Sequence, residues 1–361
     1  MTRPCELRRL HLVTYENGMR MQETLVALRQ KELIRDQLLL LEHPPVITLG
    51  RGGDAANLLA SEESLAAHGI RFYETTRGGD ITYHGPGQLV GYPLIHLGEG
   101  SRDVRKYVTR VEEVLIRTLR HFGIESTRED GKRGVWAGRE KVAAIGVRIA
   151  RWVTSHGFAL NVDPDLDHFR MITPCGLHGT GVTSISRLLG RKVSIDEVVP
   201  VLTRHFQDVF DLVLETPEAP MRIVKVLAHD HAGRILLLHR PRGDFWQPIT
   251  GRVENGESDQ QCAVRELHEE TGWRLLPSPM GLVQSFTIDP KFVGREELPF
   301  LFVDEVSFSV EADSASAVAL DQEEHDAHEW FTIPESLERI VWSNDRQSLE
   351  LLRFHLSQRR G

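Results

Sequence analysis

Residues 251–273 read GRVENGESDQQCAVRELHEETGW and predict one capped helix behind a short loop. Ser258 is a preferred N-cap residue, and Gln261 three positions later completes a capping box. Gly272 suits the C-terminal end of the same helix, since glycine readily adopts the left-handed conformation found there. The stretch therefore predicts a helix that begins after Ser258 and ends before Gly272.

Three carboxylates are expected on one face of this helix, because Glu266, Glu269 and Glu270 stand at positions i, i+3 and i+4. Carboxylates this close repel one another unless cations neutralise them, and their hard oxygen atoms suit Mg²⁺ or Mn²⁺. The alternative is a solvated acidic face on which Arg265 pairs with Glu269. The Gly and Glu spacing ahead of the helix favours the metal.

The whole stretch fits the Nudix box, GX5EX7REUXEEXGU, at every fixed position, and residues 221–358 resemble Nudix hydrolases. The resemblance implies an α/β/α sandwich that uses Mg²⁺ (or Mn²⁺) and water to cleave nucleoside diphosphates linked to another group. An acidic residue outside the box often assists such enzymes. The metal ligands implied here are Glu266, Glu269, Glu270 and Glu324.

The segments 245–251 and 342–347 are similar to the dihydroneopterin triphosphate diphosphatase branch of that family. The expected substrate is therefore a nucleotide or a pterin diphosphate compound. A module that only binds a nucleotide, or only docks a partner, is the alternative.

Upstream of the box, residues 222–228 and 235–239 read as the two strands of a hairpin. Before them, ETPEAP at 215–220 reads as a short linker. The predicted domains are therefore 1–215 and 216–361. The first carries 28 Lys and Arg against 27 Asp and Glu, a net charge of +1, whereas the second carries 15 against 25, a net of −10.

Composition limits the class of protein. The chain has 361 residues, 40% apolar and 26% charged, which is typical of a globular protein of two domains. Neither half has the basic excess of a nucleic-acid binder. No apolar run reaches the ~18 residues of a membrane span, and the N-terminus lacks a secretory signal. Three cysteines form no disulfide framework, so we expect a cytoplasmic protein.

The first half alternates predicted helices and strands, which indicates a mixed α/β (α+β) fold. The expected helices are 22–33, 103–122 and 195–210, and the expected strands are 36–41, 46–49, 142–149 and 155–162.

A glycine-rich segment, RGGDITYHGPGQ at 77–88, is the first candidate site. Its four glycines let the backbone approach a ligand closely. They flank four polar groups that could recognise one: Arg77, Thr82, His84 and Gln88. A plain structural loop could also be rich in glycine, and ligand contact is the favoured interpretation.

The second candidate is Cys175, which stands on a turn between Pro174 and Gly176. Such a cysteine is either an inert structural thiol or an exposed, activated one. Lys141 begins an apolar stretch, where its ammonium can reach water harmlessly or lie beside a thiol and favour the thiolate. The small residues Gly157 and Ala159 would leave room for a slim apolar chain.

Four blocks occur in order: RGGDITYHGPGQ, KVAAIGVRI, HGFALNV and ITPCGL. Together they resemble the octanoyltransferases of lipoate biosynthesis, over about residues 5–213. The resemblance implies a fold similar to biotin and lipoate protein ligases, and transfer of an octanoyl group from acyl carrier protein without a cofactor. The implied acceptors are lysines on lipoyl domains of 2-oxoacid dehydrogenase complexes and on the glycine cleavage H protein.

By the same resemblance, Cys175 is the nucleophile and Lys141 lowers the pKa of its thiol. The residues implied to line the acyl site are Arg77, Gly78, Gly79, Asp80, Ile81, Thr82, Tyr83, His84, Ala144, Ile145, Gly146, Gly157, Phe158 and Ala159. The acceptor amine must lose a proton, to neutral Lys141 or to His84. A lipoate or biotin ligase, which activates a free acid with ATP, is the main rival.

Overall fold

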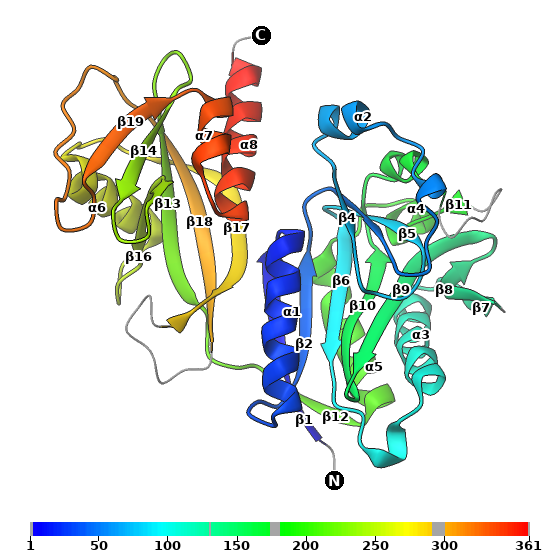
Figure 1. The fold of residues 1–361 in the computed structure, drawn as a ribbon. Helices are drawn as coiled ribbons and strands as arrows, with labels where there is room; N and C mark the ends of the chain where they lie inside the picture. Colours follow the sequence, from blue (N-terminus) through cyan, green and yellow to red (C-terminus); the bar gives the residue numbers. More distant parts are fainter. Residues whose placement is uncertain (1–2, 130, 174–180, 291–299, 360–361) are drawn as a thin grey trace. The chain divides into compact units, whose positions relative to one another are not determined.

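The computed structural model describes four stretches of the chain: residues 3–129, 131–173, 181–290 and 300–359. They form two compact units (Figure 1). The first unit comprises Met1–Leu10 and Gly18–Glu218, and the second comprises His11–Asn17 and Ala219–Gly361. Among the helices of the described stretches, none is both long and apolar enough to cross a membrane.

The first unit is built on a mixed β-sheet. The strands of this sheet are β1 (Arg3–Leu12), β2 (Asp36–Glu42), β6 (Gln88–Leu94), β7 (Thr127–Glu129), β8 (Lys132–Ala137), β9 (Glu140–Ala150), β10 (Val153–Asn161), β11 (Gly181–Val182) and β12 (Leu212–Glu215). They run in the order β1-β2-β6-β10-β9-β8-β7, with β12 beside β1 and β11 beside β9. A smaller sheet, in the order β4-β3-β5, is made of β3 (Val46–Leu49), β4 (Arg71–Glu74) and β5 (Ile81–His84).

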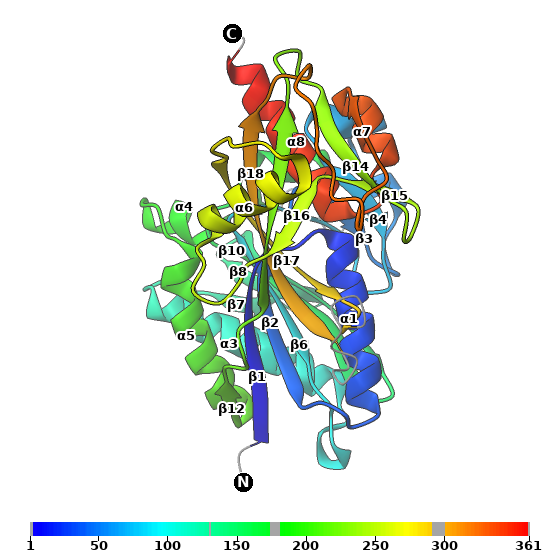
Figure 2. The same cartoon turned by 90° about the vertical axis from the view of Figure 1, so that its left-hand side faces the viewer.

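Five helices accompany these sheets: α1 (Tyr15–Gln30), α2 (Glu62–Ala67), α3 (Val104–His121), α4 (Ile185–Leu189) and α5 (Ile195–Phe210). Helices α3 and α5 lie on one side of the strands and α1 on the other (Figure 2). The α3–α5 side holds the larger core, in which Tyr107, Leu115 and Phe206 are buried. The three helices and four strands predicted for the first half are all present, but α1 runs over 15–30 rather than 22–33.

The local signals of α3 and α5 explain why these two helices were predictable. Asp103 caps α3 by accepting from the Lys106 backbone N–H at 3.0 Å. Ser194 and Glu197 form a capping box at the start of α5. Both helices then bury one apolar stripe at helical spacing. Sequence and packing therefore agree on their bounds.

The second unit is an α/β/α sandwich, as expected. Its strands are β13 (Met221–His229), β14 (Ile235–Arg240), β15 (Phe245–Gln247), β16 (Ile249–Arg252), β17 (Ser278–Ile288), β18 (Leu301–Glu311) and β19 (Ala327–Phe331). Its helices are α6 (Asp259–Thr271), α7 (Ile333–Arg339) and α8 (Ser343–Arg359). Helix α6 covers one face of the strands, and α7 and α8 cover the other (Figure 1).

Alternation along β13 accounts for these two faces. Val224 and Val226 pack in the core beneath α6, whereas Leu227 packs in the core beneath α7 and α8. Successive side chains of a strand point to opposite faces, so one buried strand supplies both cores. The predicted hairpin is present, since β13 and β14 pair antiparallel.

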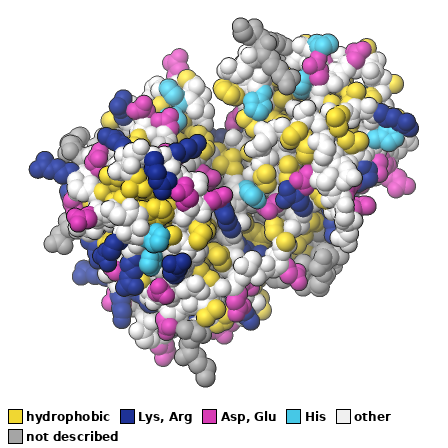
Figure 3. Space-filling model, turned by 180° about the vertical axis from the view of Figure 1, so that it is seen from behind, with side chains coloured by type: hydrophobic (Ala, Val, Ile, Leu, Met, Phe, Trp, Pro, Cys, Tyr) yellow, Lys and Arg dark blue, Asp and Glu magenta, His cyan; other side chains and the backbone are white. Residues whose placement is uncertain are grey.

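The surface agrees with the lack of a basic excess in the sequence. On the face drawn in Figure 3, Lys and Arg side chains alternate with Asp and Glu and with apolar groups. Over the described residues of that face, no continuous basic area appears, which is consistent with the absence of a basic excess in the sequence.

The pairing of β9 with β10 places small residues together. Ala144 is directly opposite Ala159, and Gly146 is directly opposite Gly157. We call these four residues the small-residue strip. Because alternate residues point to opposite faces, their neighbours Ile145 and Phe158 enter the core on the α3–α5 side instead.

We predict that Gly157→Ala destabilises the first unit by about 1–3 kcal/mol. A Cβ at this position would lie 2.1 Å from the Gly91 carbonyl oxygen and 2.6 Å from Cδ of Pro93. The first of these is backbone held in the β6–β10 pairing, so it cannot move aside cheaply. Urea unfolding measures the effect. Gly100→Ala is the control, since nothing lies within 4 Å of its added Cβ; equal stability of the two variants would contradict the prediction.

Candidate functional sites

The glycine-rich segment is anchored on both sides by its backbone. The Gly78 N–H donates to the Val147 carbonyl of β9 at 3.0 Å, and the Arg51 N–H donates to the Arg77 carbonyl at 3.0 Å. Gly146 needs its missing side chain here, because a Cβ would lie 2.7 Å from the Gly78 carbonyl oxygen. The segment is therefore fixed directly over the small-residue strip.

Arg77 is buried and held by a single residue of β3. Its Nη2 donates to the Thr48 carbonyl at 2.6 Å and to Thr48 Oγ1 at 2.8 Å. Asp80 accepts from Nδ2 of Asn57 at 2.7 Å. These side-chain contacts, together with the backbone hydrogen bonds, hold the loop in one conformation.

Strand alternation divides the next four predicted residues into two pairs. Ile81 and Tyr83 are buried in the core of the small sheet, and the Tyr83 hydroxyl hydrogen-bonds to His168 Nδ1 at 2.9 Å. Thr82 and His84 point to the opposite face. Ile81 and Tyr83 therefore pack in the core of the small sheet and not on the small-residue strip. Ile145 and Phe158 likewise pack in the larger core.

His84 belongs to a buried polar network. Its Nδ1 donates to Oε1 of Gln88 at 2.7 Å, since the Gln88 amide nitrogen is used in donating to Asn161 Oδ1 at 2.9 Å. Asn161 in turn donates to the Thr183 carbonyl, and the Thr183 N–H donates to the carbonyl of Lys141. The network therefore joins the glycine-rich segment to the strand that carries Lys141.

Two further histidines, which sequence analysis did not select, surround His84. The His43 ring lies 5.9 Å from the His84 ring and its Nε2 is 2.6 Å from the Tyr92 hydroxyl. The Tyr92 ring contacts the His156 ring edge-on. We call His43, His84 and His156 the histidine cluster. It is assembled from residues distant in sequence, so no local spacing indicated it.

Burial, together with the charge of Arg77, lowers the pKa of both His84 and His156 to about 3. Desolvation is the larger cause in each case, because it penalises the charged ring. Both rings are therefore neutral at physiological pH. A ring with so low a pKa is a weak proton acceptor. Of the two candidates for taking the proton from the acceptor amine, this favours Lys141 over His84.

These two depressed pKa values predict acid sensitivity of the first unit. The unfolded chain binds protons on both rings below about pH 6.5, whereas the native fold binds them only near pH 3. Stability is therefore fully present above about pH 6.5 and is lost as the pH falls toward 3. At about pH 5.5 the loss is about 1.4 kcal/mol for each ring, or about 3 kcal/mol in total.

The check is urea unfolding of the first unit at about pH 8 and about pH 5.5. His156→Asn should remove about 1.4 kcal/mol of the pH dependence, and Asn tolerates the left-handed φ of 55° found there. An unchanged pH dependence in this variant would refute the assignment.

Lys141 is the second residue of β9 and is buried, with its Nζ 5.0 Å from the centroid of the Trp136 ring. Its strand partner is Val182 of β11. Cys175 itself lies outside the described residues. Of its described flanks, the Thr173 N–H donates to the Asn57 carbonyl, and Gly181 of β11 pairs with Glu140 of β9.

In the second unit, the box forms the predicted helix. Ser258 and Gln261 make the capping box at the start of α6, and Gly272 ends the helix at a left-handed φ of 76°. Gly251 ahead of the helix is also required: a Cβ there would lie 1.7 Å from Cδ of Glu266. Gly251 thus allows Glu266 to approach the backbone closely, and Gly272 allows the turn that ends α6.

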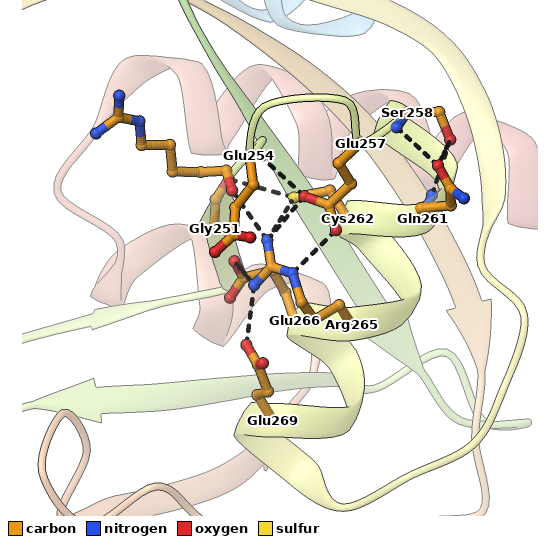
Figure 4. Close-up of polar contacts among 10 residues, drawn as sticks. Gly251, Glu254, Glu257, Ser258, Gln261, Cys262, Arg265, Glu266 and Glu269 are labelled. Carbon is orange, nitrogen blue, oxygen red and sulfur yellow. Dashed lines mark hydrogen bonds and ion pairs between the residues drawn. The ribbon is translucent and has the colours of Figure 1, made fainter.

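Arg265 is the centre of a carboxylate web (Figure 4). Its Nε and Nη2 bind both oxygens of Glu257 at 2.9 and 3.0 Å. Its Nη1 donates to Glu266 at 2.7 Å and to the half-exposed Glu269 at 2.9 Å. The Arg265 hydrogen bonds lower the pKa of Glu257 to about 2. The Arg265–Glu269 pair considered in the sequence is therefore present.

Glu270 has a different environment from the other box carboxylates. It is 6% exposed, and its Oε2 has no hydrogen-bond partner among the described residues. Burial, followed by the nearby charges of Glu266 and Glu324, raises the pKa of Glu270 well above its usual value. Glu324, an ion-pair partner of Arg240, comes from the loop before β19. The structure thus brings two of the four predicted ligands, Glu270 and Glu324, into one cluster.

A divalent cation fits this cluster. Hard carboxylate oxygens from two elements converge there, and a buried carboxylate oxygen without a partner is costly unless a cation or donor satisfies it. His325, which sequence analysis missed, completes the cluster: single ligand atoms of Glu270, Glu324 and His325 all lie within 4.8 Å of one another. Its position next to Glu324 was the available signal.

A buried ionic network lies on the opposite face of the second unit. Lys225 is fully buried, with its Nζ 2.5 Å from Glu305 Oε1 and 2.6 Å from Asp345 Oδ1. Asn344 donates to both oxygens of Glu305. Burial raises the pKa of Glu305, although the Lys225 charge opposes this. Asn344 and Asp345 belong to the segment 342–347 that resembled the pterin branch.

Taken together, these features define a two-domain enzyme of the acyltransferase class with a Nudix domain at its C-terminal side. Residues 14–207 match the lipoyl protein ligase A/B catalytic domain family, and residues 219–352 match the NUDIX domain family. The chain belongs to the octanoyltransferase family, with both domains in one polypeptide.

Two relatives carry this assignment. An octanoyltransferase of Myxococcus xanthus is 43% identical over 353 residues, which cover 95% of this chain and 97% of that protein. An octanoyltransferase of Solibacter usitatus is 53% identical over 209 residues, 58% of this chain and 94% of its own. Among solved structures, the Escherichia coli dihydroneopterin triphosphate pyrophosphohydrolase is 25% identical, with a TM-score of 0.33, and covers 37% of this chain and 96% of its own.

Proposed function

We propose that the first unit transfers an octanoyl group from octanoyl-acyl carrier protein, through a thioester on Cys175, to a lysine of a lipoyl domain. The observation that supports this most directly is the small-residue strip. Ala144–Ala159 and Gly146–Gly157 leave little side-chain volume on one face of β9 and β10, beside the strand position of Lys141. A slim acyl chain suits such a surface.

The proposed first step is thioester exchange. The Cys175 thiolate attacks the octanoyl carbonyl, a new C–S bond forms, and the C–S bond to the carrier breaks. The leaving carrier thiolate takes a proton from the Lys141 ammonium. The donor is already a thioester, so this step needs neither ATP nor a metal.

In the second step the acceptor lysine amine attacks the Cys175 thioester, an amide C–N bond forms, and the Cys175 thiolate leaves. Neutral Lys141 takes the proton that the amine loses, which restores the Lys141 ammonium. His84, with its low pKa, instead ties the glycine-rich segment to β10 through Gln88 and Asn161. We infer that the acceptors are lipoyl domains of 2-oxoacid dehydrogenase complexes and the glycine cleavage H protein.

The rival, an ATP-dependent ligase, is tested by donor choice. The full chain and a lipoyl domain are incubated with octanoyl-acyl carrier protein without ATP, or with octanoate and ATP. We expect an acylated lipoyl domain from the first mixture and none from the second. The reverse result would overturn the proposal.

For the second unit, we infer a Mg²⁺- or Mn²⁺-dependent diphosphatase that acts on dihydroneopterin triphosphate or a nucleoside triphosphate. Glu270 and Glu324 would hold the cation, with Glu266 and Glu269 on the adjoining helix face. When bound, the cation supplies Lewis-acid stabilisation of the phosphate charge. Arg265 fixes Glu266 and Glu269 in place by its hydrogen bonds.

This activity is tested by a pyrophosphate-release screen with Mg²⁺ over dihydroneopterin triphosphate, dATP and other nucleotides. We expect turnover of at least one of them, lost in Glu270→Gln. An absence of turnover of every compound would leave a binding or docking module and would reject the hydrolase proposal.

A further inference from the structure

His325 is an unusual buried histidine. Its side chain is completely buried, and neither Nδ1 nor Nε2 has a hydrogen-bond partner among the described residues. Buried polar groups are almost always paired, since the loss of their hydration is otherwise uncompensated. Both ring nitrogens of His325 are therefore open to bind a ligand or an ion.

The surroundings of His325 indicate what kind of partner this is. A ring nitrogen of His325 lies within 4.8 Å of a carboxylate oxygen of Glu270 and of Glu324. Glu270 Oε2 also lacks a partner and is buried. Two ligand atoms on one octahedral ion at about 2.1 Å would be separated by about 3.0 Å or about 4.2 Å. The three ligand atoms, all within 4.8 Å of one another, are thus close enough to share one ion after side-chain adjustment.

We propose that His325 is a nitrogen ligand of the divalent cation, together with Glu270 and Glu324. This inference rests on the proposed cation dependence of the second unit and adds a ligand outside the carboxylates of the box. One imidazole ligand would change which metal ion the site prefers. Imidazole suits transition ions such as Mn²⁺ better than it suits Mg²⁺, which prefers oxygen ligands only.

The test uses the full chain, stripped of metal with a chelator and loaded with less than one equivalent of Mn²⁺. Pulsed EPR reports ¹⁴N nuclei bound directly to Mn²⁺, without any substrate or turnover. We expect a ¹⁴N coupling in the wild-type protein. His325→Gln should remove this coupling and weaken Mn²⁺ binding about tenfold or more, with a smaller effect on Mg²⁺ binding.

His328→Gln is the matched control, because His328 is exposed and stands three residues further along the same segment. It should retain both the ¹⁴N coupling and the Mn²⁺ affinity. Bound Mn²⁺ without a ¹⁴N coupling in the wild-type spectrum rejects the assignment even if His325→Gln does not fold.

Bound Mn²⁺ without ¹⁴N coupling would overturn the assignment of His325 and leave the proposed hydrolase intact. A coupling that survives in folded His325→Gln would also overturn it. No Mn²⁺ binding at all would overturn both proposals.

Discussion

Replacing Lys141 with methionine should slow formation of the octanoyl-enzyme by about 10³-fold or more. Two effects contribute. In the proposed mechanism, loss of the Lys141 cation raises the pKa of the Cys175 thiol and lowers the thiolate fraction, and loss of the proton donor costs about 10²–10⁴-fold. Methionine keeps the apolar stem of Lys141 against Trp136, so the fold should persist.

Single-turnover acylation by octanoyl-acyl carrier protein measures this rate, and the pH profile of Cys175 alkylation reports the thiol pKa. Lys132→Met is a close control. Lys132 Nζ lies 5.2 Å from the centroid of the same Trp136 ring, but it pairs with Glu129 at 2.7 Å. Lys132→Met should change the rate less than about twofold, because a half-buried ion pair outside the proposed reaction contributes little. A wild-type rate and alkylation profile in Lys141→Met would contradict the Cys–Lys pair.

Lys225→Met should destabilise the second unit by about 3–5 kcal/mol. Lys225 is the cation between Glu305 and Asp345, and all three side chains are buried. Removal of one partner leaves the two carboxylates close together without compensation. Such a loss is far more costly than removal of a whole buried ionic group.

Hydrogen exchange measures this destabilisation of the second unit strand by strand. Peptides of β13 and β18, which pair along their whole length, should exchange faster in Lys225→Met, whereas peptides of β9 and β10 in the other unit should not change. The triple variant with Glu305→Gln and Asp345→Asn should recover part of the stability, because it buries no unpaired charge. Unchanged exchange in the single variant would show that Lys225 does not balance these carboxylates.

The sequence predicts elements best where local signals and packing agree. Helix α5 has its predicted bounds because Ser194 and Glu197 cap it and its apolar stripe is buried. Helix α1 begins at Tyr15 rather than Gln22, since its first turns, which include Gly18, lack an obvious apolar stripe and are fixed by tertiary burial of Tyr15 and Met21. It ends early, at Gln30, just before Glu32 adopts a left-handed φ of 59° without a glycine.

Site residues, too, were predicted best where their arrangement is local in the sequence. The carboxylates of α6 are local to one helix, so spacing alone placed Glu266, Glu269 and Glu270 on it. The strip residues were named correctly as small, but the register that pairs Gly146 with Gly157 is a property of the sheet. The histidine cluster and the Lys225 network join residues from distant strands and helices, and no sequence pattern links such partners.

Intact mass spectrometry of the chain after incubation with octanoyl-acyl carrier protein, without ATP or acceptor, tests the central proposal most directly. We predict a gain of one octanoyl group, lost in Cys175→Ser and released on addition of a lipoyl domain that gains the same mass. An unmodified chain that nevertheless acylates the lipoyl domain, or a Cys175→Ser chain acylated at the wild-type rate, would contradict the thioester route.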